Sequence, residues 1–205
     1  MENNRAFWDR VARFYGPIQE KSNSRLYRRT ARCCAPYIGR KDRVLELACG
    51  TGQLTRPLCG RAGSWEATDF SEKMIGQLRR SCPEQVTLSV QDATALPYED
   101  GSFQVVLIAN ALHIMPRPEQ ALREIFRVLA PGGIVLAPTF VYEGKQDIFS
   151  RFRMHMTEKL GFCSYFKWKL QDLTALLEQA GFDLLEQQIL PGHPLPEGFA
   201  AGKKK

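Results

Sequence analysis

Acidic side chains that stand next to short apolar segments, together with one glycine-rich turn, are the residues in this chain best suited to chemistry. Glu46 precedes the turn Ala48-Cys49-Gly50-Thr51-Gly52. Asp69 and Asp92 come at the ends of the next two apolar segments. Glycine lets a backbone pass close to a ligand, and a turn from strand to helix directs free N–H groups above the strand's carboxyl end. This pattern predicts a site for a nucleotide-type cofactor.

The turn does not match two common phosphate-binding loops. Gly50 and Gly52 are followed by Gln53, Leu54 and Thr55, so the third glycine of the dinucleotide fingerprint is absent. The Gly-Lys-Ser/Thr end of a P-loop is absent as well. What remains is the pattern E-x-A-x-G-x-G, in which Ala48 has a Cβ and therefore leaves less room for unusual backbone angles.

The elements that must position these residues alternate between strand and helix along the chain. Apolar, β-branched runs predict strands, and apolar residues at a period near 3.6 predict helices. Ser71 is expected to cap the helix that follows Asp69. The expected strands are 43–47, 65–69, 86–90, 103–109 and a fifth that starts over 134–137, and the expected helices begin near 53 and 70 and cover 119–129 and 170–179.

The loop resembles motif I of class I S-adenosylmethionine (SAM) dependent methyltransferases, usually written acidic-x-G-x-G-x-G. The order of this loop, Thr68-Asp69-Phe70-Ser71, Asp92-Ala93 and the later Arg-Val-Leu-Ala-Pro-Gly-Gly is similar to the methyltransferase type 11 group. It is also similar to quinone-biosynthesis C-methyltransferases, although Leu112-His113 stands where those enzymes carry an Arg-Asn pair. The resemblance implies a doubly wound, Rossmann-like α/β fold with a mostly parallel seven-stranded sheet and an N-terminal helical cap.

The same resemblance implies SAM as the cofactor and S-adenosylhomocysteine as its product. Asp69 is expected to reach the ribose hydroxyls, and Asp92 with the backbone of Ala93 is expected to hold the adenine. The alternative for Glu46 and Asp69 is helix capping, and for the glycines it is an ordinary turn. The expected cofactor-binding residues are Glu46, Ala48, Cys49, Gly50, Gly52, Asp69, Phe70, Met74, Asp92, Ala93 and Asn110.

Tyr15 and His113 are the expected catalytic residues. They are similar to the tyrosine and histidine pair of phosphoethanolamine methyltransferases, where the histidine follows the fourth strand. Such a pair would remove the acceptor's proton as the methyl group is transferred. The alternatives are a tyrosine that packs an N-terminal helix and a polar histidine at a strand end.

Length and composition favour one domain, because no linker, repeat or low-complexity tract divides the 205 residues, 44% of which are hydrophobic. We expect a cap at 1–40, a SAM-binding core at 41–141, a substrate-side insert at 142–169, and a C-terminal helix and strands at 170–205. The apolar face expected for the cap consists of Phe7, Trp8, Val11, Phe14 and Tyr15. The insert contains Phe149, Phe152, Met154, His155, Met156, Phe162, Tyr165, Phe166 and Trp168, which would line an acceptor pocket or pack as core.

The charge pattern allows a second class of partner. The net charge is +6, and Arg25, Arg28, Arg29 and Arg32 form a helical stripe that could bind RNA or an anionic membrane surface, or remain a solvated face. Asn110 is followed by Ala111, which departs from the signature of many base N-methyltransferases. We therefore expect a small-molecule acceptor, apolar or amphipathic, methylated at an O, N, S or C atom, and no nucleic-acid partner. A methyltransferase fold retained only for SAM binding is the non-enzymatic alternative.

The expected cellular location depends on the apolar runs, the N-terminal segment and the cysteines. No apolar run has the length of a membrane span, so no integral membrane contact is expected, and residues 1–13 do not form a signal peptide. The six cysteines favour free thiols in the cytoplasm, and because none is in C-x-x-C spacing we expect no metal site. The expected assembly is a monomer or homodimer.

Overall fold

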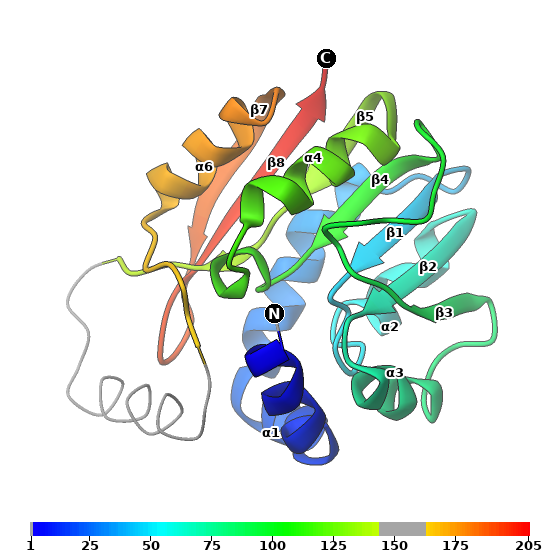
Figure 1. Ribbon diagram of the computed structural model, residues 1–205, viewed down its shortest axis with the longest axis vertical. Helices are drawn as coiled ribbons and strands as arrows, with labels where there is room; N and C mark the ends of the chain where they lie inside the picture. The colour runs from blue at the N-terminus through cyan, green and yellow to red at the C-terminus, as the bar shows by residue number, and fades with distance from the viewer. Residues whose placement is uncertain (1, 144–162) are drawn as a thin grey trace.

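The computed structural model describes residues 2–143 and 163–205, which form a mixed sheet between two layers of helices (Figure 1). The helices are α1 (Glu2–Cys34), α2 (Thr55–Leu58), α3 (Glu72–Arg79), α4 (Pro118–Val128) and α6 (Leu170–Gln179). The strands are β1 (Arg43–Leu47), β2 (Ser64–Asp69), β3 (Val86–Val90), β4 (Phe103–Ile108), β5 (Leu129–Leu136), β6 (Thr139–Phe140), β7 (Phe182–Leu190) and β8 (Glu197–Lys204). The predicted strands at 43–47 and 86–90 and the helix at 170–179 have these bounds in the structure.

The sheet has the order β3-β2-β1-β4-β5-β8-β6, with β7 on the other edge of β8. The first five strands are parallel, and β8 is antiparallel to β5, β6 and β7. β5 and β6 both pair with the same edge of β8, and they do so in a single register: Ile134 pairs with Lys203, and Thr139 pairs with Gly198. The predicted doubly wound, mostly parallel fold is confirmed, with β6 as a short eighth strand.

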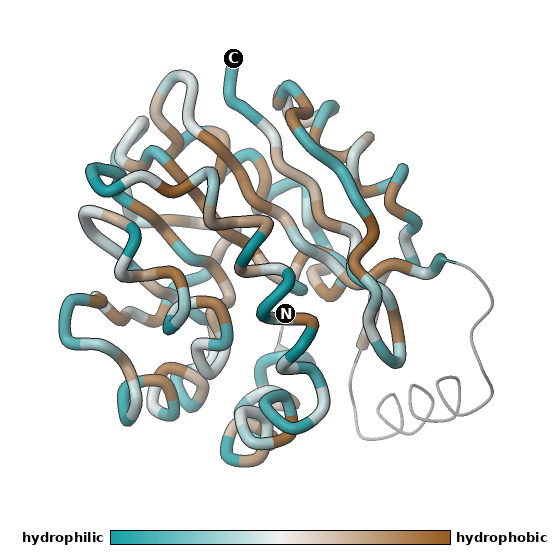
Figure 2. The backbone as a smooth tube through the Cα atoms, turned by 180° about the vertical axis from the view of Figure 1, so that it is seen from behind, coloured by the Kyte–Doolittle hydropathy of each residue, from teal (hydrophilic) through white to brown (hydrophobic). Residues whose placement is uncertain are grey.

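Both faces of the central strands are buried, as their continuous apolar sequences predict. Even-numbered residues of β1, such as Val44, pack under α1, α2 and α3, and odd-numbered ones, such as Leu45, pack under α4 and α6. Figure 2 shows these strands as brown, hydrophobic paths through the middle of the molecule. The strands are thereby fixed from both sides, which fixes the loops at their carboxyl ends.

Two local expectations were wrong. The fifth strand begins at Leu129 and not near Ile134, because Leu129 already pairs with Phe103 before a register shift that absorbs the Pro-Gly-Gly segment, where Gly132 has a φ of 75°. The helix expected to begin near residue 53 is present as the short helix α2. Phe14 was expected on the apolar face of α1, but it is 60% exposed.

The aromatic insert is only partly within the described residues. Phe149, Phe152, Met154, His155, Met156 and Phe162 lie outside them. Phe166 stacks on Trp168 with ring centroids 5.0 Å apart, while Tyr165 is largely exposed. In the two described ranges, no helix combines the length and apolar character that crossing a membrane requires.

Candidate functional site

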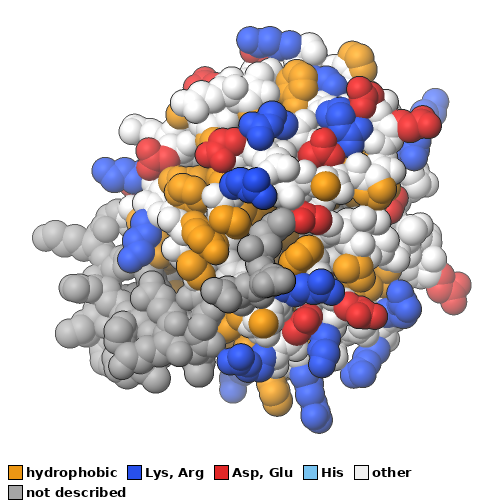
Figure 3. All heavy atoms as spheres, in the orientation of Figure 1, with side chains coloured by type: hydrophobic (Ala, Val, Ile, Leu, Met, Phe, Trp, Pro, Cys, Tyr) orange, Lys and Arg blue, Asp and Glu red, His pale blue; other side chains and the backbone are white. Residues whose placement is uncertain are grey.

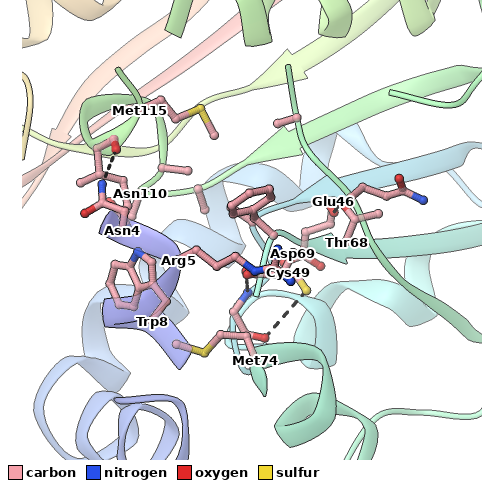
Figure 4. A pocket seen from close by; sticks show the side chains of 18 of the residues that line it. Asn4, Arg5, Trp8, Glu46, Cys49, Thr68, Asp69, Met74, Asn110 and Met115 are labelled. Atoms are coloured by element: carbon pink, nitrogen blue, oxygen red, sulfur yellow. Dashed lines mark hydrogen bonds between the residues drawn. The ribbon is translucent and has the colours of Figure 1, made fainter. Parts of the chain in front are cut away.

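A pocket lies where the carboxyl ends of β1, β2, β3 and β4 meet the first half of α1 (Figure 4). It encloses about 1120 Å³ including its opening to solvent, and its walls expose more apolar than polar surface. Ligand sites in doubly wound sheets form at this edge, where strand order changes direction. Here the change occurs between β1 and β4, which are neighbours in the sheet but not in sequence.

The turn after β1 forms the floor of the pocket through backbone angles that favour glycine. Ala48, Gly50 and Gly52 have φ values of 54°, 56° and 86°. Ala48 therefore adopts the left-handed conformation despite its Cβ, at a cost of about 1–2 kcal/mol. The Gly50 N–H donates to Asp69 Oδ2 at 2.9 Å, and the Ser71 N–H donates to Asp69 Oδ1 at 2.8 Å. Asp69 thus ties the turn after β1 to the start of α3.

Gly52 differs from the other predicted cofactor-binding residues, because it is absent from the described pocket wall. A Cβ at this position would lie 2.3 Å from Leu78 Cδ1 and 3.1 Å from Arg56 Nη1. Leu78 is fully buried in α3. The structure therefore gives Gly52 a packing role beneath the turn.

Glu46 is a buried carboxylate at the end of β1. Its Oε2 atom accepts hydrogen bonds from Thr55 Oγ1 at 2.7 Å and from Trp65 Nε1 at 2.9 Å. Burial raises the pKa of Glu46 to about 7, and these two hydrogen bonds oppose the shift. Burial likewise raises the pKa of Asp69 to about 6, against the effect of its backbone hydrogen bonds. Both carboxyl groups would gain from a cationic or hydroxylated ligand.

Asp92 follows β3, and one of its carboxylate oxygens already accepts hydrogen bonds from within the protein. Thr94 donates to Asp92 Oδ1 from its backbone N–H at 2.9 Å and from its Oγ1 at 2.7 Å. No bond to Oδ2 is present among the described residues. Asp92 and Ala93 both line the pocket, so one carboxylate oxygen is held in place while the other is available to a ligand.

Asn110 follows β4 in a left-handed conformation with a φ of 52°. Its N–H donates to the Pro138 carbonyl at 2.7 Å, and its Nδ2 donates to Glu197 Oε2 at 2.8 Å. Glu197 is completely buried at the start of β8 and also bonds Thr30 of α1. Burial raises the pKa of Glu197 to about 7. This carboxyl group connects α1 to the strand end that carries Asn110, and sequence reasoning missed it because nothing in its neighbourhood resembles a motif.

The wall on the α1 side combines aromatic and polar residues. Tyr15 lines the pocket, shares a hydrogen bond with Tyr27, and has its pKa raised by burial. Trp8 packs edge-to-face on Tyr15 with centroids 5.3 Å apart. Arg5, the single basic residue among the described wall residues, lies over the Phe70 ring at 5.0 Å. Figure 4 shows Arg5 extending from α1 across the pocket toward the strand ends.

His113 lies in a short 3-10 helix after β4 and is not among the residues that line the described pocket. Its ring is buried edge-to-face against Phe140, and its Nδ1 atom has no hydrogen-bond partner in the described ranges. Burial lowers the pKa of His113 to about 4, so the imidazole is neutral at physiological pH. The structure therefore brings Tyr15, but not the His113 ring, to the wall.

All predicted cofactor-binding residues other than Gly52 line this one pocket. The other wall residues were not predicted from the sequence, and they come from α1, from the end of β2 and from loop positions beside the motifs. The wall residues that were not predicted are Asn4, Arg5, Trp8, Tyr27, Gln53, Leu54, Thr68, Gln91, Thr94, Ala109, Ala111, Ile114, Met115 and Pro116.

Comparison with known proteins agrees with this geometry. The profile of a family described as a methyltransferase domain matches residues 44–133. The demethylmenaquinone methyltransferase of Lactococcus lactis is 31% identical over an alignment of 186 positions that covers 79% of this chain and 74% of that protein. The chain belongs to the class I SAM-dependent methyltransferases. A second such relative, from Clavibacter sepedonicus, is 36% identical over 66% of this chain, and the match spans only 57% of its length.

Solved methyltransferase structures share the fold. A SAM-dependent methyltransferase of Thermotoga maritima has a TM-score of 0.74 and 22% identity, over 97% of this chain and all of that one. A chain from the complex of a Haloferax volcanii methyltransferase with the Trm112 methyltransferase activator has a TM-score of 0.80 and 19% identity, over 98% and 96% of the two chains. At these identities the likeness concerns the fold.

Proposed function

We propose that the pocket binds SAM and that the enzyme transfers its methyl group to a small apolar or amphipathic acceptor. The observation that carries this proposal is the convergence of three carboxyl groups, Glu46, Asp69 and Asp92, on one largely apolar pocket. Enzymes of this family use a cofactor that supplies the reactive methyl group, so the protein's task is binding, orientation and exclusion of water.

The residues present fit the cofactor. The ribose hydroxyls would be held by Asp69, the adenine edge by the free Oδ2 of Asp92, and the ammonium group by the carboxyl end of β1 near Glu46. Phe70 and Met74 supply apolar surface for the base. Arg5, as the one basic side chain of the described wall, is our candidate for the cofactor's carboxylate.

The acceptor would enter beside α1. Trp8, Ile114 and Met115 give that part of the wall an apolar character, while Tyr15 adds one hydroxyl group. Such a wall suits an acceptor with an extended apolar body and one polar group. The two relatives named as demethylmenaquinone methyltransferases support a quinol as the acceptor to test first, with carbon as its acceptor atom.

Proton removal is proposed for His113, with Tyr15 as hydrogen-bonding partner of the acceptor. The imidazole of His113 is neutral at physiological pH and can accept a proton, but burial lowers its pKa to about 4 and so weakens it as a base. Its ring does not line the described wall, so this role requires the ring to turn toward the pocket. Tyr15 stays protonated at neutral pH, because its raised pKa makes it a donor and not a base.

Calorimetric titration with SAM tests the cofactor site. Asp92→Asn keeps Oδ1 for Thr94 but replaces the free oxygen by an NH₂ group, so affinity for SAM should fall about 10- to 100-fold. Glu99→Gln removes an exposed carboxylate elsewhere and should leave affinity unchanged. Failure of the folded wild-type protein to bind SAM would overturn the proposal, and methylation of a short-chain demethylmenaquinol, followed by mass spectrometry, tests the acceptor.

A further inference from the structure

The lower end of the molecule in Figure 1 is formed by the middle of α1, where the helix contains Pro17 and changes direction. Proline in a helix interior removes a backbone hydrogen bond and produces a kink. Phe14 and Ile18 stand one turn apart on either side of it and are 60% and 56% exposed. These are the two most exposed large hydrophobic side chains among the described residues.

Basic residues surround these two side chains. We use the name α1 bend surface for Arg10, Arg13, Phe14, Ile18, Lys21 and Arg25, all of which are exposed. The Arg13 guanidinium lies 5.8 Å from the Phe14 ring centroid. Figure 3 shows Lys and Arg side chains gathered at this end of the molecule, with hydrophobic atoms projecting between them.

The acidic residues of the same stretch are directed at the body of the protein. Asp9 accepts a hydrogen bond from Ser71 Oγ at the start of α3, and Glu20 forms an ion pair with Arg56 at 3.1 Å. Within the described ranges, the four basic residues of the α1 bend surface form no ion pair with an acidic side chain. The surface therefore presents four positive charges that have no acidic partner in the described part of the chain.

We propose that the α1 bend surface docks on an anionic lipid bilayer. Basic side chains around exposed apolar ones are typical of helices that lie in a membrane interface, where apolar groups enter the headgroup region and the charges meet anionic lipids. Ile18 distinguishes this surface from one suited to RNA, because an aliphatic side chain offers no stacking plane for a base.

The position of the surface has a consequence for the active site. The half of α1 that precedes the bend supplies Trp8 and Tyr15 to the pocket wall. Docking would hold this wall beside the bilayer, so an amphipathic acceptor could reach the pocket without crossing bulk water. The docking itself requires neither SAM nor methyl transfer and goes beyond the proposed function.

Vesicle co-sedimentation of the full chain tests this proposal. We expect binding to phosphatidylcholine vesicles that contain phosphatidylglycerol, little binding to phosphatidylcholine alone, and loss of binding between about 0.05 M and 0.5 M salt. Lys21→Ser with Arg25→Ser should weaken binding about 25-fold, at about fivefold per charge. The matched pair Arg40→Ser with Lys41→Ser removes two exposed charges from the turn before β1 and should have little effect.

The apolar contribution has its own matched variants. Phe14→Ser with Ile18→Ser should weaken vesicle binding at least tenfold, whereas Leu185→Ser with Ile189→Ser, exposed positions on β7, should not. Circular dichroism and SAM titration establish that each variant is folded. The proposal would be overturned if the two double charge variants lost vesicle binding equally, or if the wild type did not bind anionic vesicles. Binding of a short RNA with the same dependence on the bend, in place of vesicles, would also overturn it.

Discussion

Replacing Gly52 by alanine is the sharpest test of how the glycine turn works. Gly52 holds a motif position that predicts cofactor contact, yet the structure places it against the buried Leu78 and outside the described pocket wall. The matched control is Gly76→Ala in α3, where the same chemical change meets nothing within 4 Å. The two variants carry the same chemical change but differ in backbone conformation and in what surrounds the added methyl group.

The two variants are expected to change the free energy of unfolding in opposite directions. At Gly52 the φ of 86° costs an L-residue about 1–2 kcal/mol, and forcing a Cβ to 2.3 Å from a packed leucine methyl costs about 1–3 kcal/mol more. Alanine also lowers the conformational entropy of the unfolded chain, which stabilises the folded state by about 0.4–1 kcal/mol. The net loss for Gly52→Ala is therefore about 1–4.5 kcal/mol. Gly76 lies inside a helix, where alanine should add about 0.5–1 kcal/mol.

Urea unfolding followed by circular dichroism measures both changes, and the shift of the midpoint at constant slope gives the difference in stability. SAM titration of the folded Gly52→Ala protein then separates packing from contact. Wild-type stability in Gly52→Ala, together with lost SAM affinity, would refute the packing role and return Gly52 to the cofactor site.

Two further predictions concern buried titratable groups. The pKa of Glu197 is raised from 4.5 to about 7, so the native state resists ionisation that the unfolded state undergoes, and the stabilising effect present below pH 4.5 is lost as pH rises to 7. Glu197→Gln should remove this pH-dependent loss of stability, which amounts to at most about 3 kcal/mol between pH 5 and 7. Urea unfolding at several pH values measures it, and a variant whose stability depends on pH as the wild type's does would contradict the reasoning. If His113 removes the acceptor's proton, His113→Gln should lower turnover about 100-fold or more while SAM affinity stays at the wild-type value; unchanged turnover would end that role.

The fold was predictable because apolar content, periodicity and capping residues all indicate the same strands and helices. Arg43–Leu47 and Val86–Val90 are strands in the bounds that their apolar content predicts, and Ser71 caps α3 by accepting from the Met74 N–H. The segment 129–133 misled because helical periodicity ran into Pro-Gly-Gly, which suggested a break. In the structure, pairing of Leu129 with Phe103 determines the start of β5, and that pairing is a long-range contact no local pattern encodes.

The site was predictable only where it depends on strand ends. Acidic residues at the ends of neighbouring parallel strands lie close together, so Glu46 and Asp69 could be placed together from their spacing, and the resemblance to methyltransferases added Asp92. Glu197 and Arg5 come from the two ends of the chain and reach the site through the antiparallel strand β8 and through α1. Their positions follow from packing of elements far apart in sequence, which explains why no local signal marked them.

The two halves of α1 are held to the enzyme by different forces. The half after Pro17 buries Leu26, Ala31 and Cys34 in the main core, and it bonds Glu197 through Thr30. Among the described side chains of the half before Pro17, Phe7 and Ala12 are the buried apolar ones, and Trp8, Val11 and Tyr15 are partly buried. Polar contacts also attach this half: Asp9 accepts from Ser71 at the start of α3, and Asn4 donates to the Ile114 carbonyl after β4. Partly buried hydrogen bonds of this kind contribute about 0.5–1.5 kcal/mol each in net free energy, whereas buried apolar area contributes most of the stability. We therefore expect separation of the first half, about the bend at Pro17, to cost less free energy than separation of the second, and the first half supplies Asn4, Arg5, Trp8 and Tyr15 to the pocket wall.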